Sequence, residues 1–417
     1  MTRRRVAITG LGLVSPYGGD LADFFARLSA QESAVTHHRT DDTPRPLSLP
    51  MVLCRDFDAA AAIGKPLAAL TDRFAQMALS AAFSAWDDAG LSRSADGQDR
   101  SDWGVDWGTA LGGASYSEKI YRDLWQDGRD RVAPLSVLLG MNNAANAHLS
   151  IQFGLGGLSV SHSVACASSA ISIGDAFRRV RSGEATVMLC GGSDVPQSYG
   201  VMRAWEAMRV LAPGDEHSSS MACRPFSNER RGLVLGEGAA ALVLEDWDHA
   251  LARGATIHGE LAGFGTSCDH THLVRPDVAG QARALRLALA DASLSPEEIG
   301  YVNAHGTATA EGDPTEVAAL REVFAGHAPQ LAVSSTKSLH GHLLGAAGAI
   351  EAVITVLSLR EGVAVGTAHL EGHIDAACEG VDHVTTTRRH LPLQAALSSS
   401  FAFGGSNAVL AFRAAGA

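Results

Sequence analysis

Short runs of β-branched residues alternate with longer stretches rich in alanine and leucine along most of the 417-residue chain. This alternation is typical of an α/β protein whose helices cover a largely parallel sheet. The pattern also repeats within the chain, because AITGLG at residues 7–12 resembles ELAGFG at 260–265, and a long helical stretch follows each motif. The sequence therefore predicts two related α/β halves.

The repeat continues downstream of these glycine motifs. In the first half, a helical stretch at 78–92 leads into the strand-like WGVDWGTALGG at 103–113. In the second half, a helical stretch at 284–300 leads into YVNAHGTA at 301–308. A duplicated α/β chain usually places its active site where the two halves meet, so we expect functional residues at matching strand ends.

Length and charge limit the functions open to the chain. It is long enough for two packed lobes, and we expect residues 1–250 and 251–417 to form them. The formal net charge of -12 argues against nucleic-acid binding, because phosphate recognition needs a basic face. The longest apolar stretch, 343–359, contains Glu351 and several glycines, so we predict a buried helix there and no membrane span.

The six cysteines are scattered without a CxxC pair or the regular spacing of a disulfide framework. Reduced thiols and a cytoplasmic location fit this distribution. The amino end is basic, but a short β-like run broken by glycines follows it, so we expect no signal peptide.

Cys166 follows a predicted strand and precedes a predicted helix. Apolar residues from Ala170 to Val180 keep a helical spacing, and Gly183 is suited to end the helix. A thiol at a helix N-terminus faces unpaired backbone N–H groups and the positive end of the helix dipole, which favour the thiolate. Most free cysteines are buried and inert, as we expect for Cys190 in the strand-like ATVMLC. Position makes Cys166 a candidate nucleophile.

A second candidate segment is YVNAHGTATAEGDPTE, in which a strand delivers His305 into a glycine turn. Asp313 and Glu316 then begin a helix, and their spacing predicts a capping box. That structural role accounts for the two carboxylates without any chemistry. It does not account for a histidine at the carboxyl end of a strand, so His305 is the more informative residue.

A third segment, LAVSSTKSLHGHLLGAAGAIEA, again runs from strand to loop to helix and brings Lys337, His340 and His342 together. A histidine pair of this spacing is also found in metal sites. We disfavour a metal here, because no third ligand lies nearby in the sequence and Lys337 would repel a cation.

A fourth segment, residues 395–412, reads as two apolar strands around a Phe-Gly-Gly turn and predicts a hairpin. The glycines are explained by the turn alone. They also allow backbone N–H groups to face a developing oxyanion, and the sequence leaves both interpretations open.

These four segments together resemble the β-ketoacyl-ACP synthases of the thiolase-like superfamily, and RPFSNERRGLVLGEGAAALVLE at 224–245 resembles a further segment of that family. The resemblance spans nearly the entire chain. Thiolases use a second cysteine near the carboxyl end, where this chain has Phe-Gly-Gly, and chain-initiating synthases pair cysteine with histidine and asparagine. Cys166, His305 and His342 therefore resemble the centre of elongating synthases of type II fatty acid and polyketide synthesis.

The resemblance implies a thiolase-like fold, in which two pseudo-symmetric halves form α-β-α-β-α layers and together make one ketosynthase domain. The first half carries the nucleophile and the second carries the two histidines. The implied reaction is a decarboxylative Claisen condensation of an acyl chain, held on Cys166, with malonyl-ACP to give β-ketoacyl-ACP. No metal and no cofactor are implied, because phosphopantetheine arrives on the carrier protein.

The resemblance also assigns roles to single residues. The implied catalytic residues are Cys166, His305, His342 and Lys337. The backbone N–H groups of Cys166 and Phe403 form the implied oxyanion hole, and Phe403 gates the acyl tunnel. The implied supporting residues are Glu316, Asp313 and Glu351, and we expect Glu316 to pair with Lys337. The implied pantetheine-binding residues are Thr307, Thr309 and His272. Ala402 and His340 depart from the family pattern.

The implied partners are an acyl carrier protein and a second subunit, in a homodimer or in a heterodimer with a chain-length-factor-like chain. Arg73, Arg203 and Arg209 are candidate contacts for an acidic carrier protein. One alternative is a non-catalytic chain-length subunit, which Cys166 and both histidines oppose. Another is an enzyme of secondary metabolism that extends polyene chains. The acyl chain length and the pathway stay open.

Overall fold

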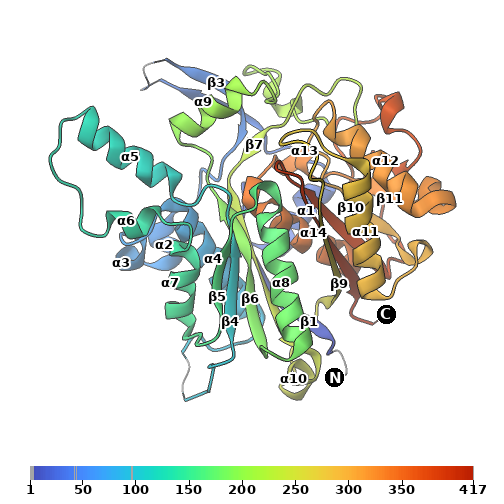
Figure 1. Ribbon diagram of the computed structural model, residues 1–417, viewed down its shortest axis with the longest axis horizontal. Helices are drawn as coiled ribbons and strands as arrows, with labels where there is room; N and C mark the ends of the chain where they lie inside the picture. Colours follow the sequence, from blue (N-terminus) through green and yellow to red (C-terminus); the bar gives the residue numbers. More distant parts are fainter. Residues whose placement is uncertain (1–3, 42, 44, 95–96, 417) are drawn as a thin grey trace.

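The computed structural model describes residues 4–41, 43, 45–94 and 97–416, and it is built around one long, folded sheet (Figure 1). The first half contributes five strands, which are β1 (Val6–Val14), β4 (Gly104–Gly108), β5 (Ser159–His162), β6 (Val187–Asp194) and β8 (Gly238–Asp246). The second half contributes β9 (Gly259–Cys268), β10 (Tyr301–Asn303), β11 (Ala332–Ser334), β12 (Asp382–His383), β13 (Ala395–Phe401) and β14 (Ser406–Ala414).

The order of the strands shows the duplication directly. It runs β11-β10-β13-β14-β9 and then β1-β8-β6-β4-β5, with β12 added beyond β11. Each strand of one half has a counterpart at the mirrored place in the other half, with the same parallel or antiparallel neighbours. β1 pairs with β9 at the centre, so the two motifs that resemble each other in the sequence lie side by side.

Helices form three layers around these strands. α8 (Ser168–Ser182) and α14 (Ala347–Glu361) lie in the middle, where each contacts strands of both halves. The outer layers are α4 (Arg73–Asp88) and α7 (Ala144–Phe153) on the first half, and α11 (Val278–Ala292) and α12 (Gly312–Phe324) on the second. The fold is therefore the layered α-β-α-β-α arrangement of the thiolase-like proteins, as predicted.

The hydrophobic cores follow from strand alternation. Met188 and Cys190 of β6 face the central helices, whereas Val187 and Leu189 face the outer layer. Side chains of both halves form the central core, and every residue of α14 from Ala347 to Leu359 is buried. The apolar stretch near 343–359 is thus the buried helix that the sequence predicts. Within the described residues, no helix is both long and apolar enough to cross a membrane.

The paired glycine motifs serve close helix packing. A Cβ on Gly10 or Gly12 would lie 2.0 or 2.2 Å from backbone oxygens of α4, and a Cβ on Gly265 would lie 2.1 Å from the Ala284 oxygen of α11. Only glycine lets the helix backbone approach the strand this closely. The same requirement in both halves explains why the two motifs resemble each other.

The remaining elements surround this framework. A small sheet comprises β2 (Thr36–Thr40), β3 (Leu47–Val52) and β7 (Leu235–Gly236). The other α-helices are α1 (Leu21–Ser29), α2 (Ala59–Ile63), α3 (Lys65–Ala68), α5 (Ala114–Trp125), α6 (Ser136–Gly140), α9 (Tyr199–Ala207), α10 (Trp247–Ala252) and α13 (Lys337–His340). α5 and α6 extend away from the layered body as an arm (Figure 1).

Candidate active site

Cys166 lies in a tight turn between β5 and α8. The turn is the short 3₁₀ helix Ala165–Ala167, and Ala165 has a left-handed φ of 47°. Ser168 stabilises it, because its hydroxyl donates to the Ala165 carbonyl at 2.7 Å and accepts from the Val164 N–H at 2.8 Å. The helix that follows ends at Gly183 as predicted. Cys166 itself precedes the α-helix and is only 5% exposed.

His342 is the direct partner of the thiol. Its Nε2 lies 3.0 Å from Cys166 Sγ. The backbone of His342 is fixed on both sides, since its N–H donates to the Val234 carbonyl and its carbonyl accepts from the Gly236 N–H. These bonds join the loop before α14 to the small sheet. The position of the imidazole ring is thus set by backbone hydrogen bonds to Val234 and Gly236, which belong to the first half.

His305 follows β10 and shares the site with His342. The two rings lie 5.3 Å apart and nearly perpendicular, and Phe401 packs against the edge of His305. Glu316 fixes the loop, because its two carboxylate oxygens accept from the N–H groups of His305 and Gly306, each at 2.7 Å. Asp313 accepts similarly from the N–H groups of residues 307, 308 and 226.

These contacts correct the capping-box prediction for Asp313 and Glu316. The residue that caps α12 is Glu311, and it makes no side-chain capping bond. Both carboxylates point instead into the loop that carries His305. The sequence spacing was compatible with either arrangement, and only the packing of the loop over α12 decides between them. Burial raises the pKa of Asp313 to about 6 and that of Glu316 to about 7.

Lys337 lies behind the two histidines and is fully buried. The expected pair with Glu316 is wrong, because the Lys337 ammonium forms its ion pair with Glu351 of α14. Neither residue of this pair lines the cavity that contains Cys166. Burial raises the pKa of Glu351, and the ammonium opposes that effect. Lys337 therefore acts on Cys166 and the two histidines through the electrostatic effect of its ammonium group, without lining the cavity.

The Phe403 turn closes the site from the β13–β14 hairpin, which forms as predicted. Gly404 and Gly405 have left-handed φ values of 90° and 81°, so the turn requires glycine. The backbone N–H of Phe403 acts on the Cys166 thiol by lowering its pKa, against the larger effect of burial. The Phe403 ring stacks on Trp205 with 6.0 Å between ring centroids. Trp205 belongs to α9, and no sequence motif pointed to it.

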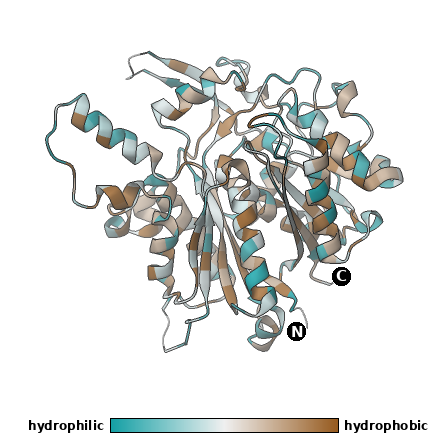
Figure 2. Ribbon diagram, in the orientation of Figure 1, coloured by the Kyte–Doolittle hydropathy of each residue, from teal (hydrophilic) through white to brown (hydrophobic). Residues whose placement is uncertain are grey.

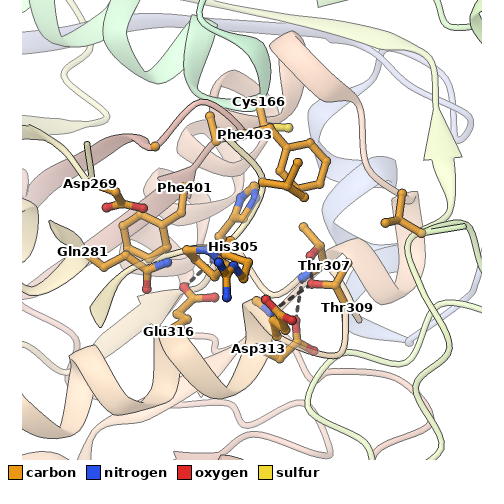
Figure 3. Close-up of a pocket in the computed structure, with 18 of the residues that line it drawn as sticks. Cys166, Asp269, Gln281, His305, Thr307, Thr309, Asp313, Glu316, Phe401 and Phe403 are labelled. Carbon is orange, nitrogen blue, oxygen red and sulfur yellow. Dashed lines mark hydrogen bonds between the residues drawn. The ribbon is translucent and has the colours of Figure 1, made fainter. Parts of the chain in front are cut away.

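A cavity of about 340 Å³ joins these groups (Figure 3). Cys166, His305, His342 and Phe403 lie along it, and so do the predicted pantetheine contacts Thr307, Thr309 and His272, with Asp313 and Glu316. The Thr307 and Thr309 hydroxyls are 3.1 Å apart. His272 is exposed, and its Nδ1 accepts from two backbone N–H groups of its own loop.

Two further polar residues were not found by sequence reasoning. Asp194 is fully buried at the end of β6, where its carboxylate accepts from the N–H groups of Ala110, Leu111 and Gly345. It thereby joins the strand ends of the first half to the start of α14. Gln281 lines the cavity, is 1% exposed and has no hydrogen-bond partner for its Oε1. Neither residue lies in a motif that distinguishes it from a surface polar residue.

Burial keeps the three central groups uncharged. It raises the pKa of the Cys166 thiol to about 12, although the Lys337 charge and the Phe403 N–H favour the thiolate. This corrects the expectation that the helix N-terminus would favour a thiolate. Burial and the nearby Lys337 ammonium hold the pKa values of His305 and His342 well below their ordinary range. The resting site is therefore a neutral thiol beside two neutral imidazoles.

Cys166, His305 and His342 also place three potential metal ligands within 4.8 Å of one another. A soft dication such as Zn²⁺ accepts this ligand set. The buried Lys337 charge opposes cation binding at this place. His340, the other member of the sequence pair, does not join the group, because its Nε2 lies 2.9 Å from the Thr336 hydroxyl.

A cysteine paired with two histidines at the junction of two duplicated α/β halves defines a condensing enzyme of the thiolase-like class. The sequence profile described as "Beta-ketoacyl synthase, N-terminal domain" matches residues 3–250, and the corresponding C-terminal domain profile matches residues 258–371. The chain belongs to the β-ketoacyl synthase family.

Full-length relatives agree with this assignment. Nodulation protein E of Rhizobium leguminosarum bv. trifolii is 39% identical over 98% of this chain and 99% of its own length. The 3-oxoacyl-[acyl-carrier-protein] synthase 2 of Coxiella burnetii is 38% identical over 98% of both chains. The chain is thus an acyltransferase, a β-ketoacyl-[acyl-carrier-protein] synthase, which condenses an acyl group with a malonyl unit as carbon dioxide is lost.

Two solved structures share the fold over nearly the whole chain. The ishigamide ketosynthase/chain length factor matches with a TM-score of 0.90 and 31% identity, covering 99% of each chain. A type II polyketide acyl-carrier protein in complex with its ketosynthase matches with a TM-score of 0.89 and 28% identity, covering 99% of this chain and 100% of the other. These similarities confirm the thiolase-like fold.

Proposed function

We propose that Cys166 carries the growing acyl chain as a thioester and that His342 and His305 serve its loading and its extension. The observation that carries this proposal is the 3.0 Å contact between Cys166 Sγ and His342 Nε2, in a cavity that His305 also lines. The reaction has two stages, acylation of the thiol and decarboxylative condensation. Neutral histidines can accept a proton in the first stage and donate hydrogen bonds in the second.

In the first stage, the thiol proton has to leave as sulfur attacks the incoming thioester, because a thiol with a pKa of about 12 is protonated at neutral pH. His342 is placed to accept that proton and to pass it to the departing carrier thiolate. The Lys337 charge stabilises the sulfur as it becomes negative. The N–H groups of Cys166 and Phe403 stabilise the oxyanion of the tetrahedral intermediate.

In the second stage, the malonyl thioester binds where both imidazoles face its carbonyl oxygen. Loss of carbon dioxide leaves an enolate, and hydrogen bonds from neutral His305 and His342 stabilise its negative oxygen. The enolate carbon then attacks the acyl group on Cys166, the carbon–sulfur bond breaks, and the released Cys166 thiolate takes up a proton from solvent. Since both histidines have pKa values well below their ordinary range, they act as neutral donors at this stage.

Intact-mass spectrometry separates these roles. After incubation with an acyl carrier substrate, the wild-type chain should gain one acyl mass, and the Cys166→Ala variant should gain none. His342→Ala should slow the acylation. His305→Ala should still be acylated but should fail to release carbon dioxide from the malonyl donor. An acyl adduct of unchanged yield in Cys166→Ala would refute the assignment of the nucleophile.

We also propose the acyl carrier protein as the macromolecular partner, with Thr307, Thr309 and His272 along the path of its pantetheine arm. No other cofactor is needed for this chemistry, and cytoplasmic location fits six cysteines that are all free thiols. A non-catalytic chain-length role finds no support in a cavity that holds an intact cysteine and two histidines.

The basic contacts for the carrier need revision. Arg73 binds Glu237 through two nitrogens, and Arg203 is held by Glu206 and by backbone carbonyls, so neither is free for docking. Arg209 is exposed, as are Arg231 and Arg275, and none of the three has an ion pair with another described residue. Arg275 lines the mouth of the cavity. We propose these three arginines as contacts for an acidic carrier.

A second subunit is the other proposed partner. The arm formed by α5 and α6 exposes a set of large apolar side chains, which are Tyr121, Trp125, Val132, Leu135, Val137, Leu138 and Met141. Figure 2 colours α6 largely as hydrophobic. Trp125 alone is 79% exposed. β5 also lies at the edge of the sheet with one side unpaired. An exposed apolar group of this size marks an interface, and we propose that the arm packs on a second copy of the chain.

A further inference from the structure

A second group of potential metal ligands lies outside the cavity, at the outer edge of the first-half sheet. It consists of Asp106 on β4, His162 on β5 and Asp175 on α8. None of the three lines the cavity around Cys166. The synthase reaction described above makes no use of them, so their convergence needs a separate explanation.

The register of the strands brings these side chains to one face. Asp106 pairs with Val160 and Gly108 pairs with His162, so Asp106 and His162 lie diagonally on the same side of the two parallel strands. That side faces α8, because the Ser172 hydroxyl donates to the Asp106 carbonyl at 2.6 Å. Asp175 lies one helical turn beyond Ser172 and therefore points to the same place.

The distances match the coordination shell of a small dication. His162 Nε2 lies 3.2 Å from Asp106 Oδ2 and 3.3 Å from Asp175 Oδ2. Ligand atoms bound to Zn²⁺ at about 2.0–2.1 Å in tetrahedral geometry lie about 3.3–3.4 Å from one another. All three ligand atoms lie within 4.8 Å of one another, which places them within reach of one ion.

Burial and charge favour the same interpretation. Asp106 is fully buried, and its Oδ1 has no hydrogen-bond partner. The two carboxylates raise the pKa of His162, so a dication that binds here displaces the imidazole proton and is then balanced by the two negative charges of Asp106 and Asp175. Arg178 lies 3.6 Å from Oδ1 of Asp175, on the oxygen that does not face His162, so Oδ2 stays directed at the cluster.

We propose that Asp106, His162 and Asp175 bind one Zn²⁺ ion per chain, with water as the fourth ligand. The ion ties β4, β5 and α8 together at one point. His162 lies four residues before Cys166, so the ion stabilises the strand and the helix on either side of the nucleophile turn. The site is structural, and it stands apart from the chemistry proposed for Cys166.

Calorimetric titration of the full-length chain with Zn²⁺ tests the site. The Cys166→Ala variant is the right starting protein, because it removes the thiol from the other cluster that could bind the ion. We expect one Zn²⁺ per chain and an increase in the melting temperature. Co²⁺ in place of Zn²⁺ should give the visible absorption of a tetrahedral site.

Two ligand variants in the same Cys166→Ala chain decide the matter. His162→Gln and Asp175→Asn should each weaken Zn²⁺ binding at least tenfold and abolish the Co²⁺ absorption. Asp175 is partly exposed, so its variant is expected to fold even if His162→Gln does not. The matched control is His258→Gln, since His258 also pairs with a carboxylate, Asp88, at 2.8 Å. The affinity of the His258→Gln variant for Zn²⁺ should be unchanged.

Absence of Zn²⁺ binding to the Cys166→Ala chain would overturn the proposal. Binding of equal strength in Asp175→Asn would overturn it as well. The acylation of Cys166 in the otherwise unchanged chain is measured separately, so failure of the zinc site leaves the proposed synthase mechanism untouched.

Discussion

The protonation of Cys166 is decided by neighbours that are distant in the sequence. Burial by both halves opposes the thiolate, whereas the Lys337 ammonium and the Phe403 N–H support it. A motif around Cys166 reveals only the adjacent helix and none of these three influences. The residue types of the site could be predicted from the sequence, but their protonation states could not, because desolvation depends on the packing of the whole fold.

The pH dependence of Cys166 alkylation follows from this environment. Because the pKa of the thiol is raised to about 12, the thiolate fraction should rise about tenfold for each pH unit across the neutral and mildly alkaline range. The rate of Cys166 modification by iodoacetamide, followed by peptide mass spectrometry, should therefore keep rising up to pH 10. A plateau with a midpoint below pH 8 would contradict a buried neutral thiol. Cys268, the exposed cysteine, is the internal reference.

The charge of Lys337 should set the acid limb of the activity profile. Since the ammonium lowers the pKa values of His305 and His342, the Lys337→Met substitution should raise them. A higher histidine pKa means that the neutral form appears only at higher pH. The acid limb of the condensation rate should therefore move to higher pH.

The same substitution leaves Glu351 without its cation in a buried place, which costs about 3–5 kcal/mol of stability. The double variant Lys337→Met/Glu351→Gln separates the two effects. It should regain thermal stability but keep the shifted acid limb, as measured by a melting curve and a pH–rate profile. An acid limb that returns to the wild-type position would show that the histidines do not sense the Lys337 charge.

At the scale of secondary structure, two central helices built alike join the halves. α8 and α14 each have 15 residues, each follows a three-residue 3₁₀ turn, and each ends at a left-handed glycine. Local patterns were enough to predict the apolar spacing and glycine end of α8, the burial of α14 and the β13–β14 hairpin. The partners of Glu316 and Lys337 were not predictable, because several carboxylates lie at suitable sequence distances and only the packing of helices selects among them.

Close contact between these two helices depends on Gly348. A Cβ at this position would lie 2.8 Å from both the backbone nitrogen and the Cβ of Ala170. We expect Gly348→Ala to force the helices apart and to cost about 1–3 kcal/mol. The melting temperature should fall accordingly. Gly326→Ala is the matched control, because a Cβ there meets nothing within 4 Å, and it should leave the melting temperature nearly unchanged.

At the scale of the whole molecule, the mirrored strand order was visible in the sequence as two pairs of similar segments. The direction and the neighbours of each strand could not be predicted from the sequence, because the connections between strands leave no local pattern. The arm formed by α5 and α6 also escaped sequence reasoning. Its apolar residues resemble those of any buried helix, and only the structure shows that they face away from the described body.

The arm gives a prediction about assembly. Val137 and Leu138 are 68% and 52% exposed, and burial of such side chains is what would hold two subunits together. The Val137→Asp/Leu138→Asp variant should shift the chain from dimer to monomer in sedimentation velocity experiments. Leu251→Asp is the control, since Leu251 on α10 is 58% exposed but lies far from the arm in the fold. Monomeric wild-type chain, or a dimer that tolerates the double substitution, would refute the assigned interface.

The matching 3₁₀ turns before α8 and α14 carry an evolutionary consequence. Ala165 and Leu344 open these turns with nearly the same left-handed φ, 47° and 48°, so Cys166 in one turn corresponds to Gly345 in the other. A Cβ on Gly345 would lie 2.3 Å from the Ala110 nitrogen. A cysteine at the twin position would therefore collide with the backbone of the first half, so the duplicated fold has room for a nucleophile in only one of its two matching turns.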